Sequence, residues 1–146
     1  MTTQTKKGRE IEGRSFDIID TEVGIHPYSA LEWPVVRRVI HATGDFDFAG
    51  KSGLVFHPRA IEAGLRAIRA GKPVIADVEM VRAGINAARL GGYGGSVHCF
   101  IGDSDVIEDA GRQGTTRAAT SMRKAAHVMD GAIVVSGNAP TALLEV

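Results

Sequence analysis

The sequence has almost no cysteine and no net charge. Cys99 is the single cysteine among 146 residues, so no internal disulfide can form, and no CxxC or cysteine and histidine pair has zinc-site spacing. Seventeen Lys and Arg balance seventeen Asp and Glu, which removes the basic surface that nucleic-acid binding requires. We therefore expect a reducing, cytoplasmic location and no nucleic-acid partner.

Long apolar runs are missing too. No run approaches the roughly 18 residues that a membrane span requires, and the polar N-terminus has no apolar segment of the kind found in signal peptides. The sequence therefore predicts no membrane partner. Residues 1–9 are predicted to form a flexible, solvated tail.

Motifs for metal binding and for hydrolysis are absent. The five histidines include no HExxH pair or facial triad, and the acidic cluster at 103–105 lacks the remaining spacing of a calcium loop. No GxSxG elbow supplies a nucleophile. The glycine cluster at 91–95 precedes an expected strand instead of a helix, which is the wrong context for a dinucleotide fingerprint. We predict no metal site and interpret residues 91–95 as a mobile loop.

The composition is that of a globular domain, with 44% hydrophobic and 23% charged residues. Apolar runs predict strands, and helical periodicity with Gly, Pro, Ser and Asn punctuation predicts helices between them. Strands that alternate with helices indicate an α/β fold with a parallel sheet covered on both faces. We predict one such domain over residues 10–146, with strands at 54–56, 73–77, 97–101 and 132–135 and helices at 11–19, 34–43, 58–70, 78–83, 104–110, 115–128 and 139–146.

His41 is the histidine with the most unusual surroundings. It lies in the last turn of the helix predicted to begin at Pro34, close to Arg37 and Arg38 and just before Gly44. A histidine in such a position can exchange protons with a ligand. A C-terminal helix histidine that only satisfies backbone carbonyls is the structural alternative.

Two turns into helices have free backbone amides at their N-termini, where anions bind. Residues 137–141 follow a predicted strand, and Asn138 either binds an anion there or simply caps the next helix. In the second turn, Thr116 precedes Arg117, a cation in a first turn where the helix dipole disfavours it. An anionic ligand explains Arg117, and so does an ordinary surface position.

Five segments together resemble one known family. They are residues 13–19, residues 37–45 around His41, and residues 76–81, 114–117 and 137–143. In this order they strongly resemble the precorrin-8X methylmutases, also called precorrin isomerases, of cobalamin biosynthesis. The resemblance extends from about Glu10 to Val146.

This resemblance implies a three-layer α/β/α fold with a flavodoxin-like sheet, and a homodimer with its pocket near the subunit interface. It implies an isomerase that moves a methyl group within ring C of a tetrapyrrole, precorrin-8X or its cobalt form, without a cofactor. The products are hydrogenobyrinate and cobyrinate. The catalytic histidine of the family matches His41, and its substrate-binding Ser and Arg residues match Ser15, Arg38 and Arg117.

The substrate that this resemblance implies carries acetate and propionate groups, which Arg side chains and helix N-termini bind well. We therefore expect Thr116 and Asn138 to join the three substrate-binding residues. The alternative function is a corrinoid-binding or carrier module without catalysis. A ligand-binding α/β domain unrelated to tetrapyrroles is a more distant alternative.

The final predicted helix leaves Leu143, Leu144 and Val146 in need of a packing surface. The resemblance implies about a third more chain, containing a further strand and a glycine-rich motif. We therefore expect the fold to be incomplete at its C-terminal side.

Overall fold

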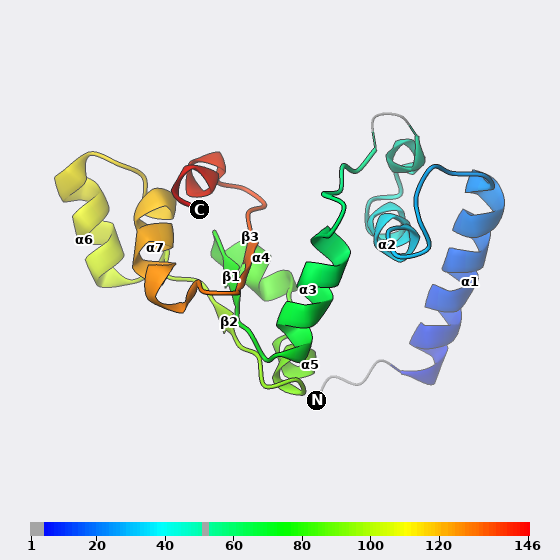
Figure 1. Cartoon of the computed structure of the whole chain (residues 1–146), viewed down its shortest axis with the longest axis horizontal. Helices are drawn as coiled ribbons and strands as arrows, with labels where there is room; N and C mark the ends of the chain where they lie inside the picture. The colour runs from blue at the N-terminus through cyan, green and yellow to red at the C-terminus, as the bar shows by residue number, and fades with distance from the viewer. Residues whose placement is uncertain (1–4, 51–52) are drawn as a thin grey trace. The chain divides into compact units, whose positions relative to one another are not determined.

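The computed structural model describes residues 5–50 and 53–146. The chain divides into two compact units, Met1–Glu62 and Ala63–Val146. Figure 1 shows the helices and strands of each. The prediction that residues 10–146 form one domain stays a prediction.

The N-terminal unit is helical. It contains α1 (Lys6–Val23), α2 (Trp33–Thr43) and the short 3-10 helix η1 (Phe46–Ala49). Thr5 begins α1, because its hydroxyl accepts a hydrogen bond from the amide of Gly8 at 3.1 Å. Residues 6–9 are thus helical, and the predicted tail was wrong for them; residues 1–4 of that tail lie outside the described residues.

The core of this unit joins α1 to α2. Ile19 of α1 is buried together with Val36 and Ile40, which lie four residues apart on α2. Pro34 stands in the first turn of α2, and Gly44 ends the helix with a φ of 70°. The helix predicted from Pro34 is therefore confirmed.

Residues 54–56 do not form the predicted strand. Leu54 and Phe56 pack against the core of the N-terminal unit. The amide of Leu54 donates to the Tyr28 hydroxyl at 3.1 Å, and that hydroxyl donates to the carbonyl of Phe48 at 2.8 Å. Leu54 and Phe56 are thus partly buried in a loop held by Tyr28 instead of in a sheet, and Val55 between them is exposed.

The remaining elements follow α3 (Ala60–Arg69), which spans the boundary between the two units and is followed by Gly71 at a φ of 68°. They are β1 (Val74–Ala76), α4 (Glu79–Gly84), α5 (Ala87–Gly91), β2 (Val97–His98), α6 (Ser104–Gln113), α7 (Arg117–Ala125), η2 (Ala126–Val128), β3 (Ile133–Val135) and η3 (Pro140–Glu145). No helix within the described ranges is long and apolar enough to cross a membrane.

The three strands form a parallel sheet in the order β2-β1-β3. Val74 is in register with Val97 on one side and with Ile133 on the other. The chain leaves β1 toward one edge and returns from β2 to the other, and right-handed crossovers place the two connections on opposite faces. Figure 1 shows α4 and α7 on opposite sides of the sheet. This is the predicted α/β fold, with a parallel sheet flanked by helices.

The sheet core contains Ile75 and the buried face of α7, with Ala118, Met122 and Ala125. Ala142 of η3 completes this cluster. Three other apolar side chains at the C-terminal end are not covered: Leu143, Leu144 and Val146 are 59%, 82% and 64% exposed.

The structure of the C-terminal unit differs from the sequence prediction in three details. The predicted strand at 97–101 pairs only over Val97–His98, and α5, which ends at Gly91, was not predicted. Asn138 does not cap the last helix, because η3 begins after Ala139 and no side chain caps it. The backbone amides of residues 137–139, which precede η3, donate their hydrogen bonds to Asp77 instead.

Asp77 joins the end of β1 to the segment after β3. The residue is fully buried, and its Oδ2 accepts hydrogen bonds from the amides of Gly137, Asn138 and Ala139 at 2.8–3.1 Å. The Ser136 hydroxyl donates to the same oxygen at 3.2 Å. Burial alone raises the pKa of this carboxyl group, but the four donors together lower it below its ordinary value.

We predict that Asp77→Asn lowers the free energy of unfolding by about 3 kcal/mol at neutral pH, because four donors lose a charged acceptor. Since the folded pKa is lowered, the charge stabilises the fold above the ordinary Asp pKa. That contribution disappears as pH falls through the folded pKa. Urea unfolding of both proteins at a series of pH values measures the difference.

The matched control is Asp130→Asn, which alters an exposed carboxylate 3.7 Å from Lys72. Its stability should stay close to wild type at every pH. If Asp77→Asn behaved like this control, the carboxylate would not be holding the strand ends together.

Candidate functional site

Ser15 and His41 form a half-buried pair in the N-terminal unit. Ser15 lies in the middle of α1 and His41 in the last turn of α2. The Ser15 Oγ and the His41 Nδ1 are 2.9 Å apart, within hydrogen-bond distance. His41 Nε2 makes no hydrogen bond within the described residues, so this nitrogen is available to a ligand.

Asp20 holds the two helices in this arrangement. One carboxylate oxygen accepts from Trp33 Nε1 at 2.8 Å, and the other accepts from Arg37 at 2.5 Å. The donors come from α2 and the acceptor from α1. Because Asp20 and the buried Ile19 join the helices near Ser15, the spacing between Ser15 and His41 is set by helix packing.

Two arginines stack on the Phe16 ring, next to His41. The guanidinium carbons of Arg37 and Arg38 lie 4.5 and 4.7 Å from the centre of the Phe16 ring, which favours cations over its face. The His41 ring lies 5.2 Å from the same ring, centre to centre. The imidazole and the two guanidinium groups therefore all pack around the Phe16 ring.

Arg38 is paired but not buried. Its guanidinium donates to Glu12, and its side chain is 54% exposed. A ligand carboxylate that binds Arg38 must either share the guanidinium with the Glu12 carboxylate or displace Glu12 from it. The sequence interpretation missed Glu12, although its place one helical turn before Ser15 brings it to the same side of α1.

The four other histidines make local contacts. His26 stacks on Trp33 at 3.9 Å, and His57 Nδ1 accepts from the amide of Arg59, as expected for a turn residue. His98 Nε2 lies 2.8 Å from the Ser96 hydroxyl, and His127 Nδ1 lies 2.7 Å from the carbonyl of Lys124. His41 is the histidine whose ring bonds a hydroxyl from another helix.

The predicted anion site at 137–141 is already filled by this chain. In doubly wound α/β folds, ligands bind beyond the carboxyl ends of the strands, where the connections diverge. Here the Asp77 carboxylate lies at that position and accepts hydrogen bonds from the amides of residues 137–139. Gly137 fits closely, because an added Cβ would come within 2.7 Å of Val81. The Asn138 amide is therefore not free for a ligand, whereas its side chain is exposed.

Thr116 and Arg117 lie at the start of α7. The Thr116 hydroxyl caps α7 by accepting from the amide of Ala119 at 3.1 Å, and it lies 2.9 Å from the Thr141 hydroxyl of η3. Arg117 is exposed and makes no ion pair or hydrogen bond within the described part of the chain. An unpaired cation beside a helix N-terminus is suited to an anionic ligand.

The structure thus brings the predicted residues into two groups. Ser15, Arg38 and His41 belong to the N-terminal unit, and Thr116, Arg117 and Asn138 belong to the C-terminal unit. Among the described residues, no group of three or more His, Cys, Asp or Glu side chains is arranged to hold a metal ion. Burial raises the pKa of the Cys99 thiol, which disfavours the nucleophilic thiolate.

Comparison with known proteins shows which family the chain belongs to. Residues 10–146 match the family described as Precorrin-8X methylmutase. A cobalt-precorrin-8 methylmutase of Priestia megaterium is 52% identical over 141 residues, which are 97% of this chain and 62% of that protein. One of Leptospira interrogans is 49% identical over 144 residues, which are 97% of this chain and 64% of that protein.

A solved structure shows the same fold. The precorrin-8X methylmutase of Thermus thermophilus superposes with a TM-score of 0.83 and 45% identity, over 94% of this chain and 66% of that one. The chain therefore spans 62–66% of the length of these three proteins. The sequence resemblance is confirmed, and the chain belongs to the precorrin-8X methylmutase family.

Proposed function

We propose that this chain is a methylmutase that moves a methyl group between adjacent carbons of ring C of a tetrapyrrole. Metal-free precorrin-8X would give hydrogenobyrinate, and the cobalt form would give cobyrinate. The observation that carries the proposal is the half-buried hydrogen bond between Ser15 and His41, with Nε2 left for a ligand. The match of residues 10–146 to the family supports it.

The reaction needs one group that gives and takes back a proton. Substrate and product are isomers, so a proton donated to the macrocycle must be returned once the methyl group has moved. Protonation redistributes the conjugated π-system and makes the rearranged skeleton accessible. Histidine is the side chain that exchanges protons near neutral pH, and we assign this exchange to His41 Nε2. The rearrangement requires no oxidant, reductant or external methyl donor, so we propose no cofactor.

Ser15 acts on His41 in this proposal. A hydroxyl both donates and accepts, so Ser15 can donate to a bare Nδ1 and accept from a protonated one. The imidazole then keeps one orientation through the proton transfer. Ser15 is therefore a positioning residue as well as a predicted substrate contact.

The charged groups of the substrate are assigned to the arginines. Acetate and propionate side chains match the forked guanidinium donors of Arg38 and Arg117. Arg117 is unpaired and adjoins the amides that begin α7, which adds a dipole contribution. Thr116 and the Asn138 side chain offer further polar contacts. We expect Arg38 to contribute less, because Glu12 competes for it.

The cobalt form is the favoured substrate. The relatives from Priestia megaterium and Leptospira interrogans, with about half of their aligned residues identical, carry the name cobalt-precorrin-8 methylmutase. Cobalt would enter as part of the substrate and leave with the product. Assays with both forms test this preference.

We predict that His41→Ala lowers the rate of methyl migration by about 10²–10⁴-fold, the usual contribution of a positioned acid or base. The fold should persist, because the ring is only half-buried. Rearrangement is followed through the absorption spectrum of the tetrapyrrole. His57→Ala, which removes an exposed turn histidine, is the control and should keep the wild-type rate. Wild-type turnover by His41→Ala would rule out His41 as the proton donor.

We predict that Ser15→Ala reduces kcat roughly tenfold with a smaller change in KM, because the His41 Nδ1 loses its hydrogen-bond partner while the substrate contacts of the arginines remain. Ser15→Thr retains a hydroxyl and should recover most of the rate. An increase in KM with unchanged kcat would instead assign Ser15 to substrate binding alone.

We predict that Arg117→Ala weakens tetrapyrrole binding by about 1.5–3 kcal/mol, the range for hydrogen bonds to charged groups. Fluorescence or absorption titration measures the affinity. Arg112→Ala removes another exposed arginine, one already paired with Asp109, and should leave the affinity unchanged. Equal affinities for both variants and wild type would remove Arg117 from the site.

A further inference from the structure

The face of α1 that packs on α2 carries an aromatic ring between two carboxylates. Glu12, Phe16 and Asp20 are spaced by four residues, so they lie on one face of the helix. Phe16 packs against the buried core that α1 shares with α2. Glu12 pairs with Arg38 of α2, one helical turn before the ring. Asp20 pairs with the adjacent Arg37, one helical turn after it.

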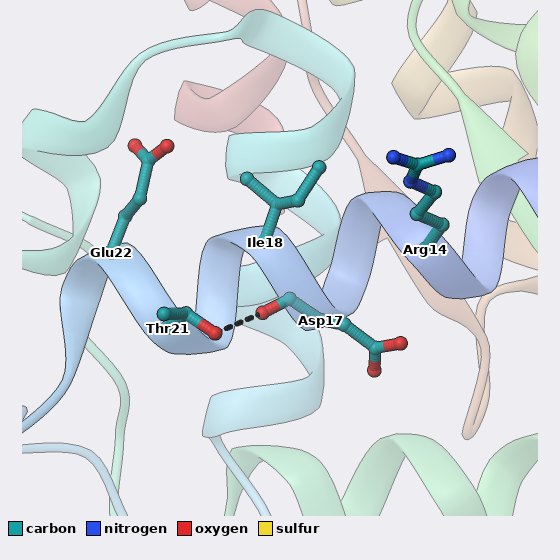
Figure 2. A pocket seen from close by; sticks show the side chains of 5 residues that line it. All are labelled: Arg14, Asp17, Ile18, Thr21 and Glu22. Atoms are coloured by element: carbon teal, nitrogen blue, oxygen red, sulfur yellow. Dashed lines mark hydrogen bonds between the residues drawn. The ribbon is translucent and has the colours of Figure 1, made fainter.

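The opposite face of α1 carries charges that take no part in this array. Arg14, Ile18 and Glu22 are displaced by two positions, about 200° around the helix, from the residues that face α2. Figure 2 shows these three side chains projecting on one side of α1, where they line a shallow pocket. Neither Arg14 nor Glu22 has an ion-pair or hydrogen-bond partner within the described residues. Glu22 is therefore a carboxylate of the same helix that lies away from the arginines of α2.

His41 shares the Phe16 ring with the two arginines. The guanidinium carbons of Arg37 and Arg38 lie 4.5 and 4.7 Å from the ring centre. The imidazole centre lies 5.2 Å from it. A proton on His41 therefore adds a third positive charge around one ring. Neighbouring cations disfavour the charged imidazole and neighbouring anions favour it, so protonation depends on how far the arginine charges are offset.

The other titratable groups near α2 do not pair with these arginines. The 3-10 helix η1, which packs against α2, carries Asp45 and Asp47. Asp45 caps η1 by accepting from the amide of Asp47 at 2.9 Å, and neither carboxylate pairs with a cation within residues 5–50 and 53–146. His26 stacks on Trp33, about two helical turns before His41. The offsetting charges therefore come from α1.

We propose that Glu12 is a positioning residue of the proton-transfer site, where its carboxylate offsets Arg38 and so favours a proton on His41. The second carboxylate, Asp20, also holds Trp33. Glu12 is therefore the residue whose charge can be removed without loosening the packing of α1 on α2. The inference rests on the proposed function for the role of His41 as proton donor, whereas the charge effect itself is measured without a tetrapyrrole.

Titration of His41 by nuclear magnetic resonance in the substrate-free chain tests the charge effect. Glu12→Gln removes the charge and keeps the side-chain length, so the His41 ring should titrate at a pH about 0.5 lower than in wild type. Arg38→Gln removes the cation and should move the midpoint in the other direction. The double variant Glu12→Gln/Arg38→Gln removes one charge of each sign and should return the midpoint close to wild type. His41→Gln identifies the signal among the five histidines.

Glu22→Gln is the matched control, because it makes the same change in the same helix on the face turned away from α2. Its His41 midpoint should equal that of wild type. The exposed His57 is an internal reference and should titrate at the same pH in every variant. High salt should reduce the shift caused by Glu12→Gln, since mobile ions screen partly exposed charges. Circular dichroism verifies the helix content of each variant.

The pH dependence of methyl migration separates this inference from the proposed function. With Glu12→Gln, the alkaline limb of kcat/KM should move to lower pH by the same amount as the His41 midpoint, because a proton donor acts only while protonated. A shifted midpoint in chains that do not rearrange the tetrapyrrole would support the charge effect and contradict the proposed function. A His41 midpoint in Glu12→Gln that stays at the value of wild type and Glu22→Gln, or that rises, would overturn the inference.

Discussion

The proposed chemistry depends on the contacts that the Asp20 carboxylate makes with Trp33 and Arg37. This carboxylate lies on α1 and holds the Trp33 and Arg37 side chains of α2 through its two oxygens. Together with Ile19, Val36 and Ile40, this contact fixes how the two helices pack. Ser15 and His41 lie on those same helices, so their 2.9 Å contact is a consequence of helix packing and not of a flexible loop. A site built on packed helices keeps the imidazole in one orientation.

Asp77 has the corresponding role in the C-terminal unit. The ends of β1 and β3 would otherwise form an open crevice of free amides, the position where doubly wound folds usually bind anions. The chain fills it with its own buried carboxylate. We propose that Arg117 at the start of α7, which has no ion-pair or hydrogen-bond partner among the described residues, binds an anionic group of the substrate instead. In the proposed function, the first unit supplies His41 and Arg38, and the second supplies Arg117.

Local patterns predicted most of the elements, and long-range contacts account for the errors. The α2, β1 and β3 segments were predictable because Pro34, Gly44 and the apolar runs act over a few residues. The run at 54–56 reads as a strand, yet its amide bonds to Tyr28, 26 residues away. Asp77 and residues 137–139 are about 60 positions apart, so no spacing rule connects them. Both the charged surroundings of His41 and the family motif singled out this residue as a candidate, whereas its hydrogen bond to Ser15 became visible only once α1 and α2 were packed.

The central claim is that this chain rearranges its tetrapyrrole and does not merely hold it. The most direct measurement is incubation of the 146-residue protein with cobalt-precorrin-8 carrying a ¹³C label in the migrating methyl group. The account predicts a product of unchanged mass whose labelled carbon is attached to the neighbouring carbon of ring C. Recovery of bound substrate with the label at its original carbon would contradict the account and identify the chain as a carrier.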